Sequence, residues 1–424
     1  MAAATTGAST EPPQALEGIK VVELPCLDTM PFLAASMAAK SFADFGAEAV
    51  KVEPPRIGAQ ERRLGPFRDE IPDPETGGLH LFLNTNKLGV TLDFAKPRGR
   101  ELLFKLLESA DILFNPNMPA LNERLGIGWR ELTRRFPKLI VVSITFFGTD
   151  SPYRDLRGGD LIATQMSVVG WETPWHQVTD LAKHPPLKMG GRQSDYLTGY
   201  GAAGSALAAL FHRKQTGAGQ HVDVSQWLSM VSNMRPAIGM YSHESKTAPG
   251  YLRFDVRRKG GAQWVYPCAD GWVSLSVATE RFWQGAKRAL GHPEWMDSEM
   301  FKTPPDRLAH LDAIEAAFMD WLSTQTRQQA FEKNQGEHVP CFPVYSPAEV
   351  ADNEQYRARG FFVEHDHLAA REVKMPGAPC KFSRTPWRIK RGAPRLGEHN
   401  RKIFVERLGL SERDVAQLSE ERIV

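Results

Sequence analysis

Short apolar segments alternate with helical segments along the first half of the chain, and this alternation limits the folds that it can adopt. The pattern predicts a helix at 33–45, and a second helix at 97–108 that begins with a proline, a residue favoured at that position. Strands that alternate with helices indicate a mostly parallel, doubly wound α/β sheet with ligands at the carboxyl ends of its strands. The predicted buried strands are 19–24, 49–53, 90–93, 112–114 and 139–147.

The pattern changes after a long predicted helix at 195–212 and a strand at 221–224. Residues 263–277 then read as a hairpin that turns around Ala269, Asp270 and Gly271. We therefore predict an α/β fold in which a Rossmann-like large domain is interrupted by a second, smaller α+β domain. The expected division is a flexible leader at 1–15, the large domain at 16–225, the small domain at 226–325 and a return to the large domain at 326–424.

Composition is that of an ordinary soluble enzyme. The 424 residues include 52 Lys and Arg against 50 Asp and Glu, a net charge of +2, so no overall field favours nucleic acid or an acidic membrane as partner. No apolar stretch reaches the roughly 18 residues that a membrane span needs. The four cysteines, Cys26, Cys268, Cys341 and Cys380, match no zinc or redox spacing, which predicts a reducing, cytoplasmic setting and no metal site. His365 and His367 are interpreted as part of a polar turn.

The segment from Gly199 to Gly204 has the spacing G-x-G-x-x-G, and Asp223 follows at the distance expected for a nicotinamide dehydrogenase. That fingerprint requires a buried strand directly before the glycines. The residues 188–195 that precede this segment are polar and glycine-rich, which argues against a core strand. A dehydrogenase therefore remains an alternative, and small residues that let a helix pack closely on a neighbour are favoured.

Asp195 follows a Gly190-Gly191 loop and stands at the expected start of the long helix. A carboxylate there is stabilised by free N–H groups and the helix dipole, so periodicity alone favours a helix cap. The other interpretation is an ionised nucleophile that attacks an activated acyl group. The residues themselves leave both interpretations open.

A set of short motifs, each weak alone, follows one another in a characteristic order. With them, the chain resembles the family III CoA-transferases, which include formyl-CoA and crotonobetainyl-CoA transferases and 2-methylacyl-CoA racemases, from residue 16 to the C-terminus. The motifs are LEGIKV (16–21), DFGAEAVKVE (44–53), NTNK (84–87), VTLD (90–93), ADIL (110–113), ERLG (123–126), RKQTGAGQ (213–220) and LGEH (396–399).

The resemblance implies that Asp195 is the catalytic residue, by its spacing to the RKQTGAGQ motif. It implies an enzyme that moves CoA from an acyl-CoA thioester to a free carboxylic acid through a covalent aspartyl intermediate, with no permanently bound cofactor. Its partners are an acyl-CoA donor, a carboxylate acceptor and a second copy in an interlocked homodimer, or a paralogous subunit. CoA contacts are implied at Leu92, Lys96, Asn117, Arg124, Leu125 and Arg157.

Two departures from the family pattern keep alternatives open. Racemases need a histidine in the segment that is here 157–162, and none is present, so transferase is favoured over racemase or isomerase. Pro54 and Asn117 stand where a basic residue and a charged or aromatic residue are usual. A catalytically inactive CoA-binding homologue therefore remains a further alternative.

Overall fold

The computed structural model describes residues 12–27, 32–173, 183, 185–233 and 263–424. The chain forms two compact units. Unit 1 comprises Met1–Gly170, Lys188–Arg235 and Gly360–Val424, and unit 2 comprises Trp171–Leu187 and Pro236–Arg359. No helix within the described residues is long and apolar enough to span a membrane.

Unit 1 is built on a six-stranded, entirely parallel sheet with the order β3-β2-β1-β4-β5-β6. This is the doubly wound order in which the chain moves outward in one direction, returns to the centre and moves outward in the other. The predicted mixed α/β fold with a parallel sheet is therefore confirmed. The strands are β1 (Lys20–Glu23), β2 (Glu48–Glu53), β3 (Leu88–Thr91), β4 (Ile112–Asn115), β5 (Ile140–Thr145) and β6 (His221–Ser225).

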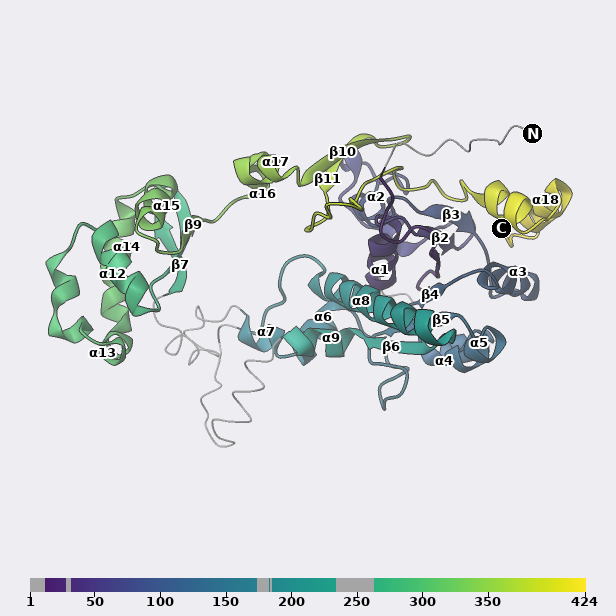
Figure 1. Cartoon of the computed structure of the whole chain (residues 1–424), viewed down its shortest axis with the longest axis horizontal. Coiled ribbons are helices and arrows are strands. Elements are labelled where there is room, and N and C mark those ends of the chain that lie inside the picture. Colours follow the sequence, from purple (N-terminus) through teal and green to yellow (C-terminus); the bar gives the residue numbers. More distant parts are fainter. Residues whose placement is uncertain (1–11, 28–31, 174–182, 184, 234–262) are drawn as a thin grey trace, which may run out of the picture. The chain divides into compact units, whose positions relative to one another are not determined.

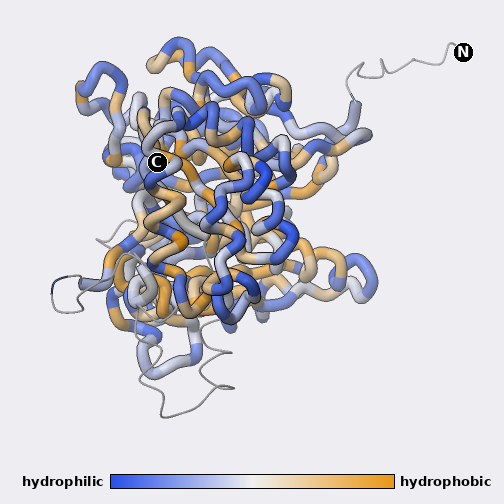
Figure 2. Tube along the Cα trace, turned by 90° about the vertical axis from the view of Figure 1, so that its left-hand side faces the viewer, coloured by the Kyte–Doolittle hydropathy of each residue, from blue (hydrophilic) through white to orange (hydrophobic). Residues whose placement is uncertain are grey.

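Both faces of this sheet are covered, which explains why its strands β4 and β5 read as nearly continuous apolar runs. Val21 packs with α1 (Ala34–Ala43) and α8 (Gln193–Thr216) on one face. Its neighbour Val22 points the other way and packs with α3 (Pro97–Leu107) and α18 (Glu412–Glu420). In Figure 2, orange hydrophobic stretches of the chain alternate with blue hydrophilic ones. The short side chains of α1 let this helix lie close to both the sheet and α8.

The C-terminal part of the chain returns to the edge of the sheet at β3. The backbone N–H groups of Gly89 and Thr91 donate to His399 Nδ1 at 3.2 Å and Asn400 Oδ1 at 2.9 Å. Lys96 Nζ donates to the carbonyls of Glu421 and Arg422, so α18 lies beside α3 although the two are far apart in sequence (Figure 1). A discontinuous large unit follows from these contacts.

Unit 2 contains a three-stranded antiparallel sheet of β7 (Gln263–Cys268), β8 (Gly271–Ser276) and β9 (Cys341–Pro343). The predicted hairpin is thus β7-β8. The predicted small domain, 226–325, differs from unit 2 at both ends. Cys341 pairs with Leu275, so the chain stays in unit 2 until Arg359, while α9 (Gln226–Asn233) belongs to unit 1.

Two local predictions need correction. His365 and His367 do not form a polar turn, because they lie in β10 (Phe362–His367), which pairs with β11 (Arg371–Pro376). Within the predicted leader, 1–11 lie outside the described residues, but Gln14 is buried and its Nε2 donates to the carbonyl of Asp44.

The remaining helical elements of unit 1 are short, and in unit 2 only α12, α14 and α15 reach ten residues or more among the described elements. In unit 1 they are η1 (Gln60–Arg63), η2 (Arg68–Glu70), α2 (Gly78–Leu83), α4 (Pro119–Arg124), α5 (Trp129–Arg135), α6 (Asp160–Met166) and η7 (Arg401–Arg407). Helix α7 (Val169–Glu172) crosses the boundary between the units. In unit 2 they are α12 (Glu280–Ala289), η5 (Glu294–Asp297), η6 (Glu299–Phe301), α13 (Pro304–Ala309), α14 (Leu311–Ser323), α15 (Arg327–Gly336), α16 (Pro347–Asp352) and α17 (Glu354–Arg359).

Candidate active site

Asp195 lies in the first turn of α8, and its side chain is completely buried. The chain enters this helix through Gly191, whose φ of +73° lies in the left-handed region that favours glycine. Because the first N–H groups of a helix lack intrahelical partners, they stabilise negative charge in this turn. The fold thus places a carboxylate away from water at a position that tolerates its charge.

Both oxygens of the Asp195 carboxylate accept hydrogen bonds from side chains. Arg192 Nε donates to Oδ2 at 2.7 Å, and Gln226 Nε2 donates to Oδ1 at 2.9 Å. The backbone of Leu33, just before α1, supplies a further hydrogen bond. The carboxylate is therefore held in one orientation by three separate segments of unit 1.

Burial raises the pKa of Asp195 to about 6, and the Arg192 guanidinium opposes that shift without cancelling it. The ordinary pKa of an aspartate is about 3.9. Asp195 is consequently ionised at neutral pH, yet it is more basic than an exposed aspartate. A desolvated carboxylate of this kind is suited to nucleophilic attack on an acyl carbon.

A second carboxylate, that of Asp160, lies near the Asp195 carboxylate. Asp160, at the start of α6, accepts hydrogen bonds from Ser194 Oγ at 2.6 Å and from the Ser194 backbone N–H at 3.1 Å. Lys188 Nζ lies 2.6 Å from its other carboxylate oxygen. Gln226 Nε2 also donates to Ser194 Oγ, so the two carboxylates belong to one polar network. Asp160 therefore fixes the start of α8 through its bonds to Ser194.

The Gly199 to Gly204 segment lies inside α8 and does not open a helix after a strand. A Cβ at Gly199 would lie 2.6 Å from Met37 Cβ and 2.8 Å from the Ala34 carbonyl oxygen on α1. The glycine thus permits close packing of α8 on α1. This placement contradicts the dehydrogenase alternative, because no helix N-terminus is available at these glycines for a pyrophosphate.

The residues predicted to contact CoA fall into two groups. Leu92 and Leu125 belong to the hydrophobic core of unit 1, with 1% and 9% of their surface exposed. Asn117 is also buried, where its side chain accepts from the Leu27 N–H and donates to the Pro25 carbonyl. These three residues support the neighbouring loops and expose little surface in this structure, and their contact with CoA stays a prediction.

In the predicted set, Arg124 and Arg157 are exposed and Lys96 is half-buried. Lys96 binds the carbonyls at the end of α18. The loop that carries Arg157 is tied to α4, the helix of Arg124, because Arg154 pairs with Glu123 and Asp155 accepts from the Ala120 N–H. Arg124 and Arg157 therefore lie on connected elements.

The family model of CoA-transferase family III matches residues 16–400. The chain belongs to this family.

Relatives and solved structures agree with that membership. The chain is 30% identical to a succinyl-CoA–D-citramalate CoA-transferase from Chloroflexus aurantiacus, over 98% of this chain and all of the relative. It is 28% identical to a formyl-CoA:oxalate CoA-transferase from Streptomyces avermitilis, over 97% of this chain and all of that relative. A CaiB/BaiF family protein from Brucella suis superposes with a TM-score of 0.78 at 25% identity, covering 93% of this chain and 99% of that structure. The relatives support CoA transfer as the chemistry of this chain.

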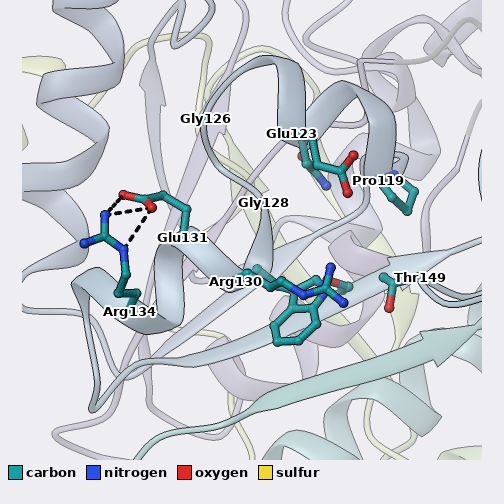
Figure 3. A pocket seen from close by; sticks show the side chains of 11 residues that line it. Pro119, Glu123, Gly126, Gly128, Arg130, Glu131, Arg134 and Thr149 are labelled. Carbon is teal, nitrogen blue, oxygen red and sulfur yellow. Dashed lines mark hydrogen bonds and ion pairs between the residues drawn. The ribbon is translucent and has the colours of Figure 1, made fainter.

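In this family III chain, a cavity of about 360 Å³ lies between α4, α5 and β5. Figure 3 shows Glu123 and Arg130 at this cavity, with Glu131 and Arg134 joined to each other at its side. The Arg130 guanidinium lies 4.5 Å over the Trp129 ring, which itself stacks on His221. Arginine and indole surfaces of this kind suit a nucleotide.

A second cavity of about 620 Å³ lies beside the first turn of α8. It is lined by Gln193 and Tyr196 of that turn, by Phe82 of α2 and by residues 373–376 of β11. Most of its surface is apolar. It therefore offers room for an uncharged group beside the first turn of α8, and Asp195 itself does not line it.

Two residues of the family III site were not predicted from the sequence, Arg192 and Gln226. Gln226 follows directly after β6, so a polar residue at the carboxyl end of a buried strand was the signal that could have indicated it. Arg192 stands three residues before Asp195, and no sequence pattern distinguishes it from a surface arginine. Within the described part of the chain, no group of three or more metal-ligating side chains gathers.

Proposed function

We propose that this protein transfers CoA from an acyl-CoA thioester to a free carboxylic acid, with Asp195 as the covalent nucleophile. The observation that carries the proposal is a completely buried, hydrogen-bonded aspartate at the start of α8 in a family III chain. Its raised pKa increases its nucleophilicity, and its two side-chain donors together with the Leu33 backbone orient it.

The first half of the reaction moves CoA onto the enzyme. An oxygen of Asp195 attacks the donor thioester carbon, the C–S bond breaks, and CoA leaves as a thiolate with a mixed anhydride on the enzyme. The thiolate then attacks Asp195 Cγ, the C–O bond breaks, and the donor acid leaves as a carboxylate. The product is an aspartyl-CoA thioester, and no net proton is gained or lost.

The second half repeats these steps with the acceptor. The acceptor carboxylate attacks Asp195 Cγ and displaces CoA thiolate, which gives a second anhydride. The thiolate attacks the acceptor acyl carbon, so that the acceptor leaves as its CoA thioester and the Asp195 carboxylate is regenerated. We expect backbone N–H groups near Gly190 and Gly191 to stabilise the developing oxyanions.

We place the CoA nucleotide near Arg124 and Arg157, with Lys96 as a further cation and the α4-α5 cavity as the space available to it. Leu92 and Leu125 support this region from the hydrophobic core of unit 1, and Asn117 supports it through its hydrogen bonds to the loop at Pro25 and Leu27. No permanently bound cofactor is part of the proposal. The relatives named above act on succinyl-CoA, formyl-CoA, citramalate and oxalate, and these compounds form the natural first panel of donors and acceptors.

We further propose an interlocked homodimer as the working assembly. A relative from Chloroflexus aurantiacus, 30% identical, is named as the beta subunit of a succinyl-CoA–L-malate CoA-transferase, so a paralogous partner subunit is the alternative assembly. Native mass spectrometry of the purified chain distinguishes the two, because a homodimer forms from this chain alone.

The test of the function is to trap the intermediate. The protein is incubated with each acyl-CoA of the panel and then with hydroxylamine, and the peptide that contains Asp195 is examined by mass spectrometry. We expect a hydroxamate on Asp195, and a loss of transfer of at least about 1,000-fold in Asp195→Asn. An unmodified peptide with every donor, or undiminished transfer by Asp195→Asn, would exclude the proposed nucleophile.

A further inference from the structure

Lys188 connects the loop that leads into the active site with the carboxylate of Asp160. Its Nζ donates to the backbone carbonyls of Met189 and Gly191, at 2.8 and 2.5 Å, and lies 2.6 Å from Asp160 Oδ2. One ammonium group therefore holds two peptide groups of the Gly190-Gly191 loop and, at the same time, a charged side chain at the start of α6.

Asp160 uses its other carboxylate oxygen to hold the first turn of α8. Its Oδ1 accepts from the backbone N–H and the hydroxyl of Ser194, the residue directly before Asp195. Only 9% of the Asp160 side chain is exposed, so its ion pair with Lys188 is partly removed from water and is stronger than an exposed pair. One carboxylate thus links the loop that precedes Asp195 with the turn that carries it.

The contacts of Lys188 also set the direction of peptide groups in this loop. In a trans peptide the carbonyl and the following N–H point in opposite directions. Lys188 binds the carbonyls of Met189 and Gly191. The N–H groups of the residues that follow them, Gly190 and Arg192, therefore point away from the ammonium group. Lys188 thus fixes the orientation of backbone donors in the segment where we expect oxyanions to be stabilised.

The same ion pair acts on the charge of the Asp195 carboxylate. Burial raises the pKa of Asp195 most, Arg192 lowers it, and Asp160 raises it further. Because Lys188 pairs with Asp160, it offsets part of the negative charge that opposes ionisation of Asp195. The groups next to this carboxylate are Arg192 before α8, Tyr196 on α8, the Leu33 backbone before α1, Asp160 on α6 and Gln226 on α9.

We propose that Lys188 is a positioning residue for the transfer reaction, which acts through Asp160 to hold the glycine loop and the Asp195 carboxylate in the arrangement that attacks the donor thioester. This inference rests on the proposed function. Lys188 acts on the geometry and the charge of the nucleophile, and not on the affinity for acyl-CoA. Its loss should therefore slow the chemical steps more than it weakens binding of the donor.

The test compares Lys188→Met with Asp160→Asn, which each remove one member of the pair. We expect kcat for transfer to fall about tenfold to a hundredfold in both, with a much smaller change in the KM for donor acyl-CoA. The acid limbs of kcat/KM, near pH 6 in the wild type, should move in opposite directions by up to about one pH unit. Lys188→Met leaves the charge of Asp160 without this cation, so its limb moves up, whereas Asp160→Asn removes that charge, so its limb moves down.

Two further variants sharpen the comparison. Lys188→Arg keeps the positive charge and should return the acid limb to its wild-type position. The double variant should lose no more kcat than the worse of the two single variants, because Lys188 and Asp160 act as one unit. The position of a limb does not depend on how much of a variant is folded, so it separates positioning from loss of structure.

Lys214→Met is the matched control, because it removes one positive charge from the exposed far end of α8. An equal loss of kcat in Lys188→Met and Lys214→Met would show a general effect of charge and overturn the inference. Wild-type kcat in Lys188→Met, or acid limbs that move the same way in Lys188→Met and Asp160→Asn, would overturn it as well while the wild-type protein is still labelled at Asp195. If the wild-type protein itself is never labelled, the proposed function fails and this inference fails with it.

Discussion

Two of the places where unit 1 buries carboxylates differ in how completely nearby cations compensate the negative charge. At the carboxyl end of β1, Glu23 and Glu61 are enclosed with Lys51 and Lys87, and Lys51 Nζ lies 2.5 Å from Glu23 and 2.6 Å from Glu61. We call these four residues the buried tetrad. At α8, Asp195 has one guanidinium partner, which is partly exposed to solvent.

The pKa values show what this difference does. Burial raises the pKa of Glu61, but Lys51 more than reverses that shift, and the pKa lies well below its ordinary value. Burial raises the pKa of Asp195 as well, and there Arg192 does not reverse it, so the pKa stays at about 6. Both carboxylates are buried, but the enclosed Lys51 lowers the pKa of Glu61. The partly exposed Arg192 compensates the charge of Asp195 only in part, so this carboxylate stays more basic than usual.

Helix α1 lies between the two places. Ser36 Oγ lies 2.7 Å from Glu23, and the Ser36 carbonyl accepts from Lys87. The backbone of Leu33, three residues earlier, bonds to Asp195. The tetrad therefore fixes the helix that contributes one hydrogen bond to the active-site carboxylate.

The largest effect on stability is expected from breaking the tetrad. Glu61→Gln leaves Lys51 with less compensation inside the protein and should lower the free energy of unfolding by about 3–5 kcal/mol, measured by urea denaturation. Glu406→Gln removes an exposed partner of Arg401 and is the control, with a change of about 0.5 kcal/mol or less. Similar values for the two variants would refute the contrast between enclosed and exposed pairs.

We expect Asp195→Asn to raise the free energy of unfolding, in contrast to Glu61→Gln, which lowers it. The pKa of Asp195 is raised in the folded state, so its contribution to stability is complete below about pH 4 and is lost as pH rises through 6. The neutral variant should therefore be more stable than wild type by up to about 3 kcal/mol at pH 7.5 and equally stable below about pH 4. A variant that is less stable at pH 7.5 would contradict incomplete compensation at this site.

Gly199→Ala tests whether the close packing of α8 on α1 helps to hold Asp195. The added Cβ would meet Met37 and the Ala34 carbonyl, so α1 and α8 must separate, at a cost of about 1–3 kcal/mol in unfolding free energy. Gly204→Ala in the same helix meets no atom within 4 Å and should stabilise the protein by about 0.5–1 kcal/mol. We expect transfer activity to fall in Gly199→Ala alone; a fall in both variants would point away from the α1 contact.

The smallest expected effect is a shift in the pH dependence of transfer activity. Gln226→Met removes the donor to Asp195 Oδ1, which favours the ionised form, so the pKa of Asp195 should rise further. The acid limb of kcat/KM against pH, near 6 in the wild type, should move upward by up to about one pH unit. Ser232→Ala, on the same helix and exposed, is the control. A limb that moves down would contradict the assigned direction of the hydrogen bond.

Much of the fold could be predicted because its signals are local. Strands β4 and β5 of the parallel sheet read as apolar runs, and the helix that carries Asp195 is continuous from Gln193 to Thr216. The division of the chain was harder, because β9 joins unit 2 by pairing with a strand more than sixty residues earlier in the sequence. His365 and His367 were misread for a similar reason, since pairing with β11 decides their conformation.

By itself, the sequence determined the alternation of strands and helices, the family and the location of an aspartate at a helix start. Only the tertiary structure decided what surrounds that aspartate. Gln226 reaches it from 31 residues away because β6 pairs beside β5, and Leu33 reaches it because Gly199 lets α1 approach. Spacing along a chain encodes local conformation, but a pKa depends on burial and on the charges that folding brings together.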